Sequence, residues 1–162
     1  MRGLLVNLAL LFAALLVATS PAVAADPASG ARVDASNFDA IVAASDAAFV
    51  VKVHSPRCGT CQEMRPTWDA LVAARSNDVK FATVDIDDDR GMKLAVELGV
   101  LDDGVPAVWG FDRAAEGERS TPRKLWSGYD APSARELAAA IFEGGGVDLN
   151  GARTADGFVA KA

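Results

Sequence analysis

The sequence predicts a single α/β domain in which strands and helices alternate along the chain. Short β-branched runs are separated by stretches whose apolar residues recur at helical spacing. The composition is 51% hydrophobic and 23% charged, which is typical of a folded chain and not of a disordered one. The two cysteines are too few for the multi-bridge framework of a small disulfide-stabilised domain. One small globular domain is the class that remains.

The first 24 residues have the pattern of a cleaved secretory signal. Met1-Arg2-Gly3 is followed by an apolar run at 4–17 and then by Ala22-Val23-Ala24, an A-x-A cleavage pattern. The apolar run is shorter than the roughly 20 residues that span a bilayer, which disfavours an uncleaved membrane anchor. We therefore expect an exported protein with no membrane attachment after cleavage, in a compartment where disulfides persist.

The first elements after the signal can be placed in chain order. Residues 25–32 are rich in Pro, Gly, Ser and Ala, so we expect a flexible lead-in before a folded domain at 33–143. A short helix capped by Ser36 and Asn37 should follow, because the next apolar residues share one helical face. The β-branched run at 49–53 is long enough for a buried strand.

The alternation continues through the second half of the chain. After Cys61, apolar positions recur at helical spacing through Val72, and Pro66 should kink this helix or start its second part. The further elements that we predict are strands at 79–86, 105–111 and 124–126, helices at 92–98 and 133–142, a polar loop at 112–122 and a mobile tail at 144–162. The three tryptophans fall on helix and strand positions, which predicts core side chains for Trp68, Trp109 and Trp126.

Cys58-Gly59-Thr60-Cys61 carries the candidate chemistry. The motif follows a predicted strand and precedes a predicted amphipathic helix, whose N-terminus would stabilise a thiolate on the first cysteine. Such a thiolate attacks a substrate disulfide, and the second cysteine then resolves the mixed disulfide. Gly59 allows a tight turn and leaves room for a partner chain. We therefore predict a redox-active pair, with Cys58 as the nucleophile and Cys61 as the resolving thiol.

Other roles for the cysteine pair are weaker. A structural disulfide that closes a two-residue loop constrains the unfolded chain very little. Half of an intermolecular zinc or copper site would usually need a further soft ligand, and only methionines and His54 are available. The acidic run of Asp85, Asp87, Asp88 and Asp89 lacks the glycine and terminal glutamate of a calcium loop, so we interpret it as solvated charge. We expect no metal and no cofactor.

From about residue 33 to residue 142 the sequence resembles the thioredoxin superfamily. The resemblance rests on the strand at 49–53, the run at 54–61 around the cysteines, and the following helix with Pro66 and Trp68. It continues through the strand that ends at 84–87, through Gly104-Val105-Pro106, and to Gly128. The resemblance implies a thioredoxin fold, in which a central mixed β-sheet is flanked by helices in a single domain.

The resemblance also implies a substrate-contact edge. In the family the proline that matches Pro106 is cis and lies beside the redox cysteines, and the backbone of the preceding residue pairs with substrate. Carried over to this sequence, Val105 and Pro106 become substrate-contact residues. Arg57, Gly59 and Thr60, which surround the first cysteine, complete the expected substrate-binding set.

Within the superfamily, the run at 51–58 and the later Arg65-Pro66-Thr67-Trp68 look more like protein disulfide isomerase modules than like cytosolic thioredoxins. Two departures from those modules flank the cysteines. Arg57 replaces a tryptophan, and its positive charge should favour the Cys58 thiolate and a more oxidising couple. Thr60 replaces a histidine or proline and cannot supply a cation, so it acts in the opposite direction.

Two further departures lie on the preceding strand. His54 takes an aromatic position, and packing is its favoured role, although it could titrate near the site. Lys52 takes the place of a buried acid that in many members relays protons to the resolving cysteine. A charged lysine is costly to bury, so we favour a spacer at the strand edge, with snorkelling or a shifted pKa and proton transfer at Cys61 as the alternative.

The sequence therefore predicts a thiol–disulfide oxidoreductase, active as a monomer on protein thiols and disulfides together with an unidentified redox partner. The formal net charge of −6 disfavours nucleic-acid binding. The compartment is a periplasm, a secretory-pathway lumen or the outside of the cell, and the lumen is disfavoured because 158–162 is no retention signal. Two alternatives remain: a non-catalytic thioredoxin-like adaptor for exported clients, and a dedicated reductant in haem or metal-centre maturation.

Overall fold

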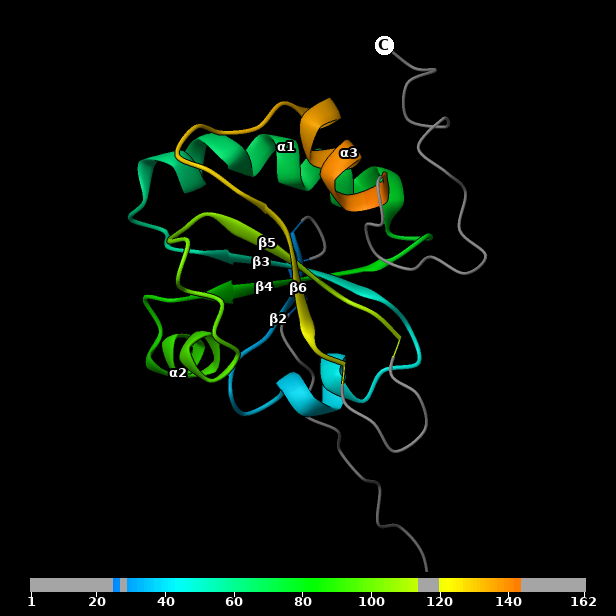
Figure 1. The fold of residues 1–162 in the computed structure, drawn as a ribbon, viewed down its shortest axis with the longest axis vertical. Coiled ribbons are helices and arrows are strands. Elements are labelled where there is room, and N and C mark those ends of the chain that lie inside the picture. Colours follow the sequence, from blue (N-terminus) through cyan, green and yellow to red (C-terminus); the bar gives the residue numbers. More distant parts are fainter. Residues whose placement is uncertain (1–24, 27–28, 114–119, 144–162) are drawn as a thin grey trace, which may run out of the picture.

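The computed structural model describes residues 25–26, 29–113 and 120–143 as a sheet with helices on both faces (Figure 1). In chain order the elements are β1 (Ala25–Asp26), β2 (Gly30–Arg32), a short π-helix η1 (Asp39–Ala43), β3 (Phe49–His54), α1 (Gly59–Arg75), β4 (Lys80–Asp85), α2 (Asp89–Glu97), β5 (Ala107–Phe111), β6 (Pro122–Ser127) and α3 (Ala134–Phe142). Three segments with predicted roles lie outside the described residues: the expected signal at 1–24, the middle of the polar loop at 114–119 and the expected tail at 144–162.

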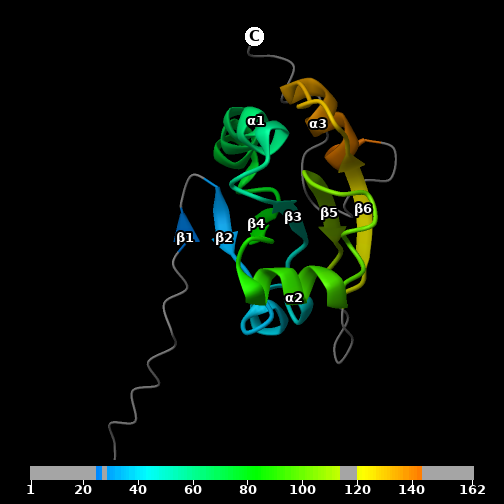
Figure 2. The ribbon, with the colours of Figure 1, turned by 90° about the vertical axis from the view of Figure 1, so that its left-hand side faces the viewer.

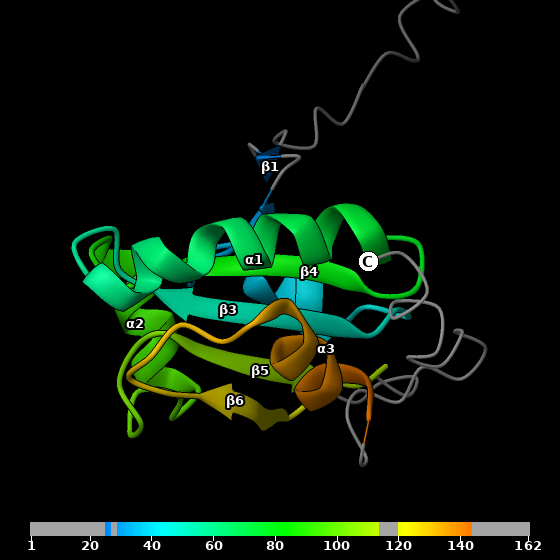
Figure 3. The same cartoon turned by 90° about the horizontal axis from the view of Figure 1, so that it is seen from above.

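One mixed sheet with the strand order β1-β2-β4-β3-β5-β6 forms the centre of the described fold. β2 and β3 both run parallel to β4, whereas β5 is antiparallel to β3 and β6 is antiparallel to β5. α1 and α3 cover one face of the sheet, and α2 with η1 covers the other (Figures 1 and 2). Seen from above, α1 runs along β3 and β4 (Figure 3). The predicted α/β class, with its flanked mixed sheet, is confirmed.

β3 separates two hydrophobic cores, because successive side chains of a strand point to opposite faces of its sheet. Phe49, Val51 and Val53 belong to the core under η1 and α2, whereas Val50 belongs to the core under α1 and α3. The same alternation turns Lys52 toward α1, on the face that Val50 shares. A charged side chain is thereby placed under the helix that carries the cysteines.

Two parts of the expected flexible lead-in at 25–32 form strands instead: Ala25–Asp26 is β1, which pairs with β2 at Gly30–Arg32. Gly30–Arg32 forms β2, which pairs with β4 through Ala31 opposite Ala82 and Arg32 opposite Thr83. Gly30 has φ +90, and a Cβ at this position would lie 2.5 Å from the carbonyl oxygen of Phe81. The glycine therefore serves a close approach of two backbones, and its presence was misread as a sign of flexibility.

α1 is longer than the sequence predicts and is not divided at its proline. It runs from Gly59 to Arg75 with Pro66 inside. Proline has no N–H to donate to the carbonyl of Gln62, one turn earlier. Both residues are exposed, so that carbonyl can be hydrated and the helix continues. Within the described segments, neither this helix nor any other is long and apolar enough to cross a membrane.

The tryptophan side chains divide into one core residue and two boundary residues. Trp68 is fully buried, as predicted, and its ring packs edge-on against Phe81 with centroids 5.5 Å apart. Its Nε1 donates a hydrogen bond to the carbonyl of Ser29 at 2.9 Å, which ties α1 to the start of β2. Trp109 and Trp126 are only partly buried and pack at the margins of the two cores.

Candidate active site

Cys58 is the N-cap residue of α1. Its backbone is extended, and its sulfur accepts a hydrogen bond from the N–H of Cys61 at 3.2 Å. The first turn of a helix has N–H groups without helical partners and a positive dipole end, and both stabilise a negatively charged sulfur. The side chain of Cys58 is half-buried, so a substrate sulfur can reach it. The strand–turn–helix setting predicted for the motif is the one observed.

Cys61 lies one turn into α1 and is buried, with 6% of its surface exposed. Burial raises the pKa of this thiol to about 12, and its contact with Cys58 adds to the increase. A backbone hydrogen bond from Ser55 and the positive charge of Lys52 act in the opposite direction. Both cysteines are free thiols in this structure. At neutral pH Cys61 therefore holds its proton, which leaves Cys58 as the thiol able to attack first.

The loop before β5 lies against Cys58. The Val105–Pro106 peptide bond is cis, as the resemblance implied, and Pro106 is buried. Cys58 Sγ donates a weak hydrogen bond to the carbonyl of Val105 at 3.6 Å. The structure thus brings Val105, one of the expected substrate-contact residues, to the sulfur of Cys58. Gly104, just before them, has φ +74, which a side chain would oppose.

The sequence suggested that Arg57 places a free positive charge beside Cys58. In the structure this charge is paired with a carboxylate. The Arg57 guanidinium donates two hydrogen bonds of 2.9 Å to the Asp87 carboxylate. The Ser55 hydroxyl donates to the same carboxylate at 3.0 Å and accepts from the backbone N–H of Arg57. These bonds, with Arg57 contributing most, lower the pKa of Asp87. The pair fixes the turn before Cys58 and offsets the positive charge next to it.

The two residues between the cysteines have different surroundings. Gly59 has no heavy atom within 4 Å of where a Cβ would stand, so this side of the turn is open. Thr60 donates a hydrogen bond from its hydroxyl to the carbonyl of Tyr129 at 2.8 Å. This bond attaches the first turn of α1 to the segment between β6 and α3. The side chain of Tyr129 is 93% exposed beside it.

The favoured interpretation of Lys52 as a spacer at the strand edge is wrong. β3 is a central strand with β4 and β5 on its two sides, and Lys52 is only 4% exposed. Its ammonium lies 5.0 Å from the ring centroid of Trp68, an arrangement in which the ring face stabilises the charge. Its burial also excludes snorkelling, which would bring the ammonium to the surface.

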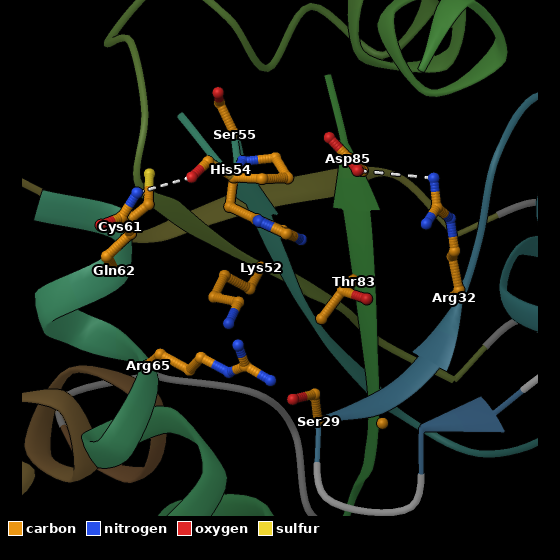
Figure 4. Close-up of a pocket in the computed structure, with 12 residues that line it drawn as sticks. Ser29, Arg32, Lys52, His54, Ser55, Cys61, Gln62, Arg65, Thr83 and Asp85 are labelled. Atoms are coloured by element: carbon orange, nitrogen blue, oxygen red, sulfur yellow. Dashed lines mark hydrogen bonds and ion pairs between the residues drawn. The ribbon is translucent and has the colours of Figure 1, made fainter. Parts of the chain in front are cut away.

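A cavity of about 880 Å³ lies beside the cysteines, between α1 and the ends of β2, β3 and β4 (Figure 4). Cys61, Lys52 and His54 all line it. Burial and the neighbouring charge of Lys52 lower the pKa of His54 to about 4, although Asp85 acts in the opposite direction. His54 is therefore neutral at physiological pH.

Sequence reasoning missed the residues that hold the active-site turn. Asp87 was taken as part of a solvated acidic run, yet Asp87, Asp85 and Asp88 each have a partner. Asp85 pairs with Arg32 at 3.4 Å, and Asp88 caps α2. Tyr129 could have been noticed as the single tyrosine of the chain, but nothing in the local pattern links it to Thr60. These contacts cross between elements, so local sequence carries no signal for them.

Metal chemistry finds no support in the part of the chain that the structure describes. No group of three or more His, Cys, Asp or Glu side chains is arranged there to hold an ion. The arrangement around Cys58 is suited to thiol chemistry instead, with one accessible and one buried sulfur on the first turn of a helix.

Residues 30–109 match the family model described as thioredoxin. These residues run from β2 through most of β5 and include both cysteines, Lys52 and the cis proline. The match therefore covers the sheet centre and the two cysteines with the loop that contacts Cys58, but not Tyr129.

Curated relatives are similar in sequence to this chain, and a solved structure shares its fold. The chain is 40% identical over 100 residues to the protein disulfide isomerase-like 1-3 of Oryza sativa subsp. japonica, and 38% identical over 73 residues to the human protein disulfide-isomerase A6. These alignments cover 60% and 45% of the chain but only 17% and 16% of the relatives' own lengths. The crystal structure of the Trx4 domain of ERdj5 superposes with a TM-score of 0.56 and 19% identity, covering 70% of this chain and 92% of that domain.

Proposed function

Because the chain contains a domain of the thioredoxin family, we propose that it is a thiol–disulfide oxidoreductase that exchanges disulfides with exported proteins through Cys58 and Cys61. One observation carries the proposal. The half-buried sulfur of Cys58 accepts the N–H of Cys61 at the start of α1, while the thiol of Cys61 is itself buried. An accessible nucleophile and a protected second thiol are what a two-step disulfide exchange requires.

The exchange balances in atoms and electrons. The Cys58 thiolate attacks one sulfur of a substrate disulfide, forming a mixed disulfide and releasing the other substrate sulfur as a thiolate that takes up a proton. Cys61 then loses its proton and attacks Cys58 Sγ, which releases the second substrate thiol and leaves a Cys58–Cys61 disulfide. The substrate gains two electrons and the protein loses two. The same steps in reverse oxidise a substrate dithiol.

Catalysed reduction of insulin, with dithiothreitol as the electron donor, tests the activity. We expect turnover by the wild-type protein, none by Cys58→Ser, and a trapped mixed disulfide with Cys61→Ser, which can attack but not resolve. Lys93→Gln, on the far face of the sheet, is the matched control and should retain full activity. Wild-type protein without activity would contradict the proposal and favour the adaptor, and activity that survives Cys58→Ser would contradict the role of Cys58.

We also propose that the protein acts after export, which is supported by the signal pattern at 1–24 and by the disulfide isomerase names of its relatives. Its direction of action depends on the potential of the Cys58–Cys61 couple. A value near about −270 mV would mark a reductant, including one in cofactor maturation, and a value of roughly −120 to −180 mV would mark an oxidant or isomerase. Equilibration of the purified protein with glutathione buffers measures it.

A further inference from the structure

We propose that the exposed ring of Tyr129 is a specificity-determining contact, which receives a large apolar side chain next to the reacting cysteine of a substrate polypeptide. This inference rests on the proposed function, because it takes the mixed disulfide at Cys58 as the point where the substrate is attached. Tyr129 belongs neither to the cysteine motif nor to the loop before β5. Its role would therefore be to select substrates and not to carry out the exchange.

The register of β5 and β6 brings Tyr129 toward the loop that contacts Cys58. The two strands are antiparallel, and Ala107 lies opposite Ser127 at the end where β5 begins and β6 ends. Val105 stands two residues before the first of this pair and Tyr129 two residues after the second, so both chains leave the sheet at the same end. The carbonyl of Val105 accepts the weak hydrogen bond from Cys58 Sγ at 3.6 Å. The sheet thus places Tyr129 at the end of the molecule that carries the nucleophilic sulfur.

A hydrogen bond from the cysteine motif supports the same placement independently. The Thr60 hydroxyl donates to the carbonyl of Tyr129 at 2.8 Å. Thr60 stands between the two cysteines on the first turn of α1. In Figures 1 and 3 the segment that follows β6 runs to the end of the sheet where α1 begins, and it then turns back to α3. A polypeptide whose sulfur is bonded to Cys58 therefore has Tyr129 as a neighbour.

The backbone that carries Tyr129 is held at both ends. A Cβ on Gly128 would lie 2.9 Å from the Trp126 ring, so this ring packs directly against the start of the segment. At the other end Pro132 is buried, and Ser133 begins α3 with a capping box. A substrate that contacts the segment therefore orders little backbone, which lowers the entropic cost of binding.

The ring of Tyr129 is suited to contact a partner. The residue is 93% exposed, the largest fraction of any large apolar residue in the part of the chain that the structure describes. Tyrosine offers a large contact area with few rotatable bonds, and it is frequent at binding hot spots. Val105 is half-buried, and no heavy atom lies within 4 Å of where a Cβ of Gly59 would stand. These apolar and open surroundings favour a large apolar side chain over a charged one.

Peptide kinetics in a Cys61→Ser background, in which the mixed disulfide persists, test the preference. Each peptide has one cysteine bonded to thionitrobenzoate, flanked on both sides by phenylalanine, serine or arginine. Cys58 attacks the peptide sulfur and releases the coloured thionitrobenzoate thiolate, which gives the second-order rate constant. We expect the phenylalanine peptide to react about tenfold faster than the serine peptide, because apolar area is buried against an aromatic ring. The ratio of the two rates cancels any change in the reactivity of the Cys58 thiol itself.

Variants in the same background locate the preference. Tyr129→Ala should reduce the rate ratio to near one, whereas Tyr129→Phe should keep it. Thr60→Val removes the hydroxyl that holds the segment and should lower the ratio, and Thr60→Ser should preserve it. Val96→Ala shortens an exposed apolar side chain on α2 and is the matched control, which should leave the ratio unchanged. A ratio that survives Tyr129→Ala, a ratio near one before substitution, or an arginine peptide that reacts fastest overturns the inference.

Binding without chemistry separates this inference from the proposed function. If Cys58 releases no thionitrobenzoate from any peptide, the proposed function fails, and binding alone then decides the inference. The chain has a single tyrosine, so its ring resonances in NMR spectra report on this site only. With the Cys58→Ser/Cys61→Ser protein and peptides that carry serine in place of cysteine, the phenylalanine-flanked peptide should shift these resonances at a lower concentration than the serine-flanked one. Equal affinities, or no shift with either peptide, would then overturn the inference as well.

Discussion

Cys61 is the residue whose environment most clearly constrains the chemistry. Its burial raises the pKa of the thiol to about 12, while the neighbouring Cys58 is half-buried and accepts an N–H from the first turn of α1. The two thiols are only two residues apart, yet the helix start turns one toward solvent and the other into the protein. The spacing of the motif was readable from the sequence, but this division of exposure comes from the packing of α1 on β3.

We predict that iodoacetamide will alkylate the reduced protein at Cys58 and spare Cys61 from pH 6 to pH 9. The thiolate is the reactive form, and a pKa of about 12 keeps the thiolate fraction of Cys61 near one part in a thousand or less at pH 9. Peptide mass spectrometry after timed quenching measures both sites. Urea-unfolded protein is the control and should be alkylated at both. Equal rates at the two sites in the folded protein would show that the burial of Cys61 is transient.

The second residue-scale prediction concerns His54 and stability. Burial and the charge of Lys52 lower the pKa of His54 to about 4 in the folded state, against about 6.5 when unfolded. Between these values the unfolded chain binds more protons than the folded one, so the free energy of unfolding increases with pH across that window. His54 therefore contributes stability that is fully present above about pH 6.5 and is lost as the pH falls toward 4.

Urea denaturation from pH 4 to pH 7.5 measures this linkage. Carboxylates titrate in the same experiment, so the quantity to compare is the difference between wild type and His54→Gln, which keeps a polar side chain but cannot titrate. We expect the wild-type midpoint to fall more steeply below pH 6.5 than that of the variant. In Lys52→Met the pKa of folded His54 should be lowered less, because the charge of Lys52 is absent. The midpoint should therefore fall less steeply below pH 6.5 than in the wild type. Parallel curves for wild type and His54→Gln would contradict the lowered pKa.

At the scale of elements, the contact between the end of β4 and the active-site turn is the feature that the sequence did not disclose. Asp87 follows β4, and it holds Arg57 and Ser55 by hydrogen bonds of 2.9 to 3.0 Å. The register of β3 against β4, with His54 opposite Asp85, brings these two strand ends together. A sequence reading can identify both strands and still miss this ion pair, because register is set by the whole sheet.

We predict that Asp87→Asn will speed alkylation of Cys58 at pH 7. Loss of the carboxylate charge frees the Arg57 guanidinium, and a free positive charge beside a sulfur favours its reactive thiolate. The double variant Asp87→Asn/Arg57→Gln should return the rate to near that of Arg57→Gln alone, since the second change removes the freed charge. If Asp87→Asn instead slows alkylation, or if the two changes are additive, the pair does not act by offsetting the charge of Arg57.

The extent of prediction from sequence also differs between elements. β3 and the helical pattern of α1 were predicted because a β-branched run and a 3.6-residue repeat are local signals. Gly30 was misread because its role depends on the backbone of Phe81, far away in the sequence, and the helix continues through Pro66 instead of starting a second part there. Lys52 was misplaced for a related reason, because a lysine is seldom buried and its position over the Trp68 ring beside the cavity depends on residues far away in the sequence.

On the scale of the whole molecule, the site depends on a strand that the sequence assigned to a flexible segment. β2 covers the edge of β4 that β3 leaves unpaired, and the carbonyl of Ser29, just before it, accepts the Trp68 Nε1–H at 2.9 Å. Ser29, Gly30 and Arg32 also form one wall of the cavity behind Cys61. The start of the folded domain is therefore coupled both to the core under α1 and to the surroundings of Cys61.

We predict that a variant without residues 25–32 will fold but will lose about 2 kcal/mol or more in the free energy of unfolding. The variant lacks the hydrogen bonds between β2 and β4 and the bond from Trp68 Nε1 to Ser29, which contribute about 1 kcal/mol each. Trp68→Phe, which removes the hydrogen bond and part of the ring, is the partial comparison. The truncation also leaves β4 as an open edge, so light scattering should reveal self-association at high concentration. Urea midpoints and slopes measure the first effect. A truncated protein as stable as the complete chain, and equally monodisperse, would mean that 25–32 is the flexible lead-in its composition suggested and that the cavity wall it forms is dispensable.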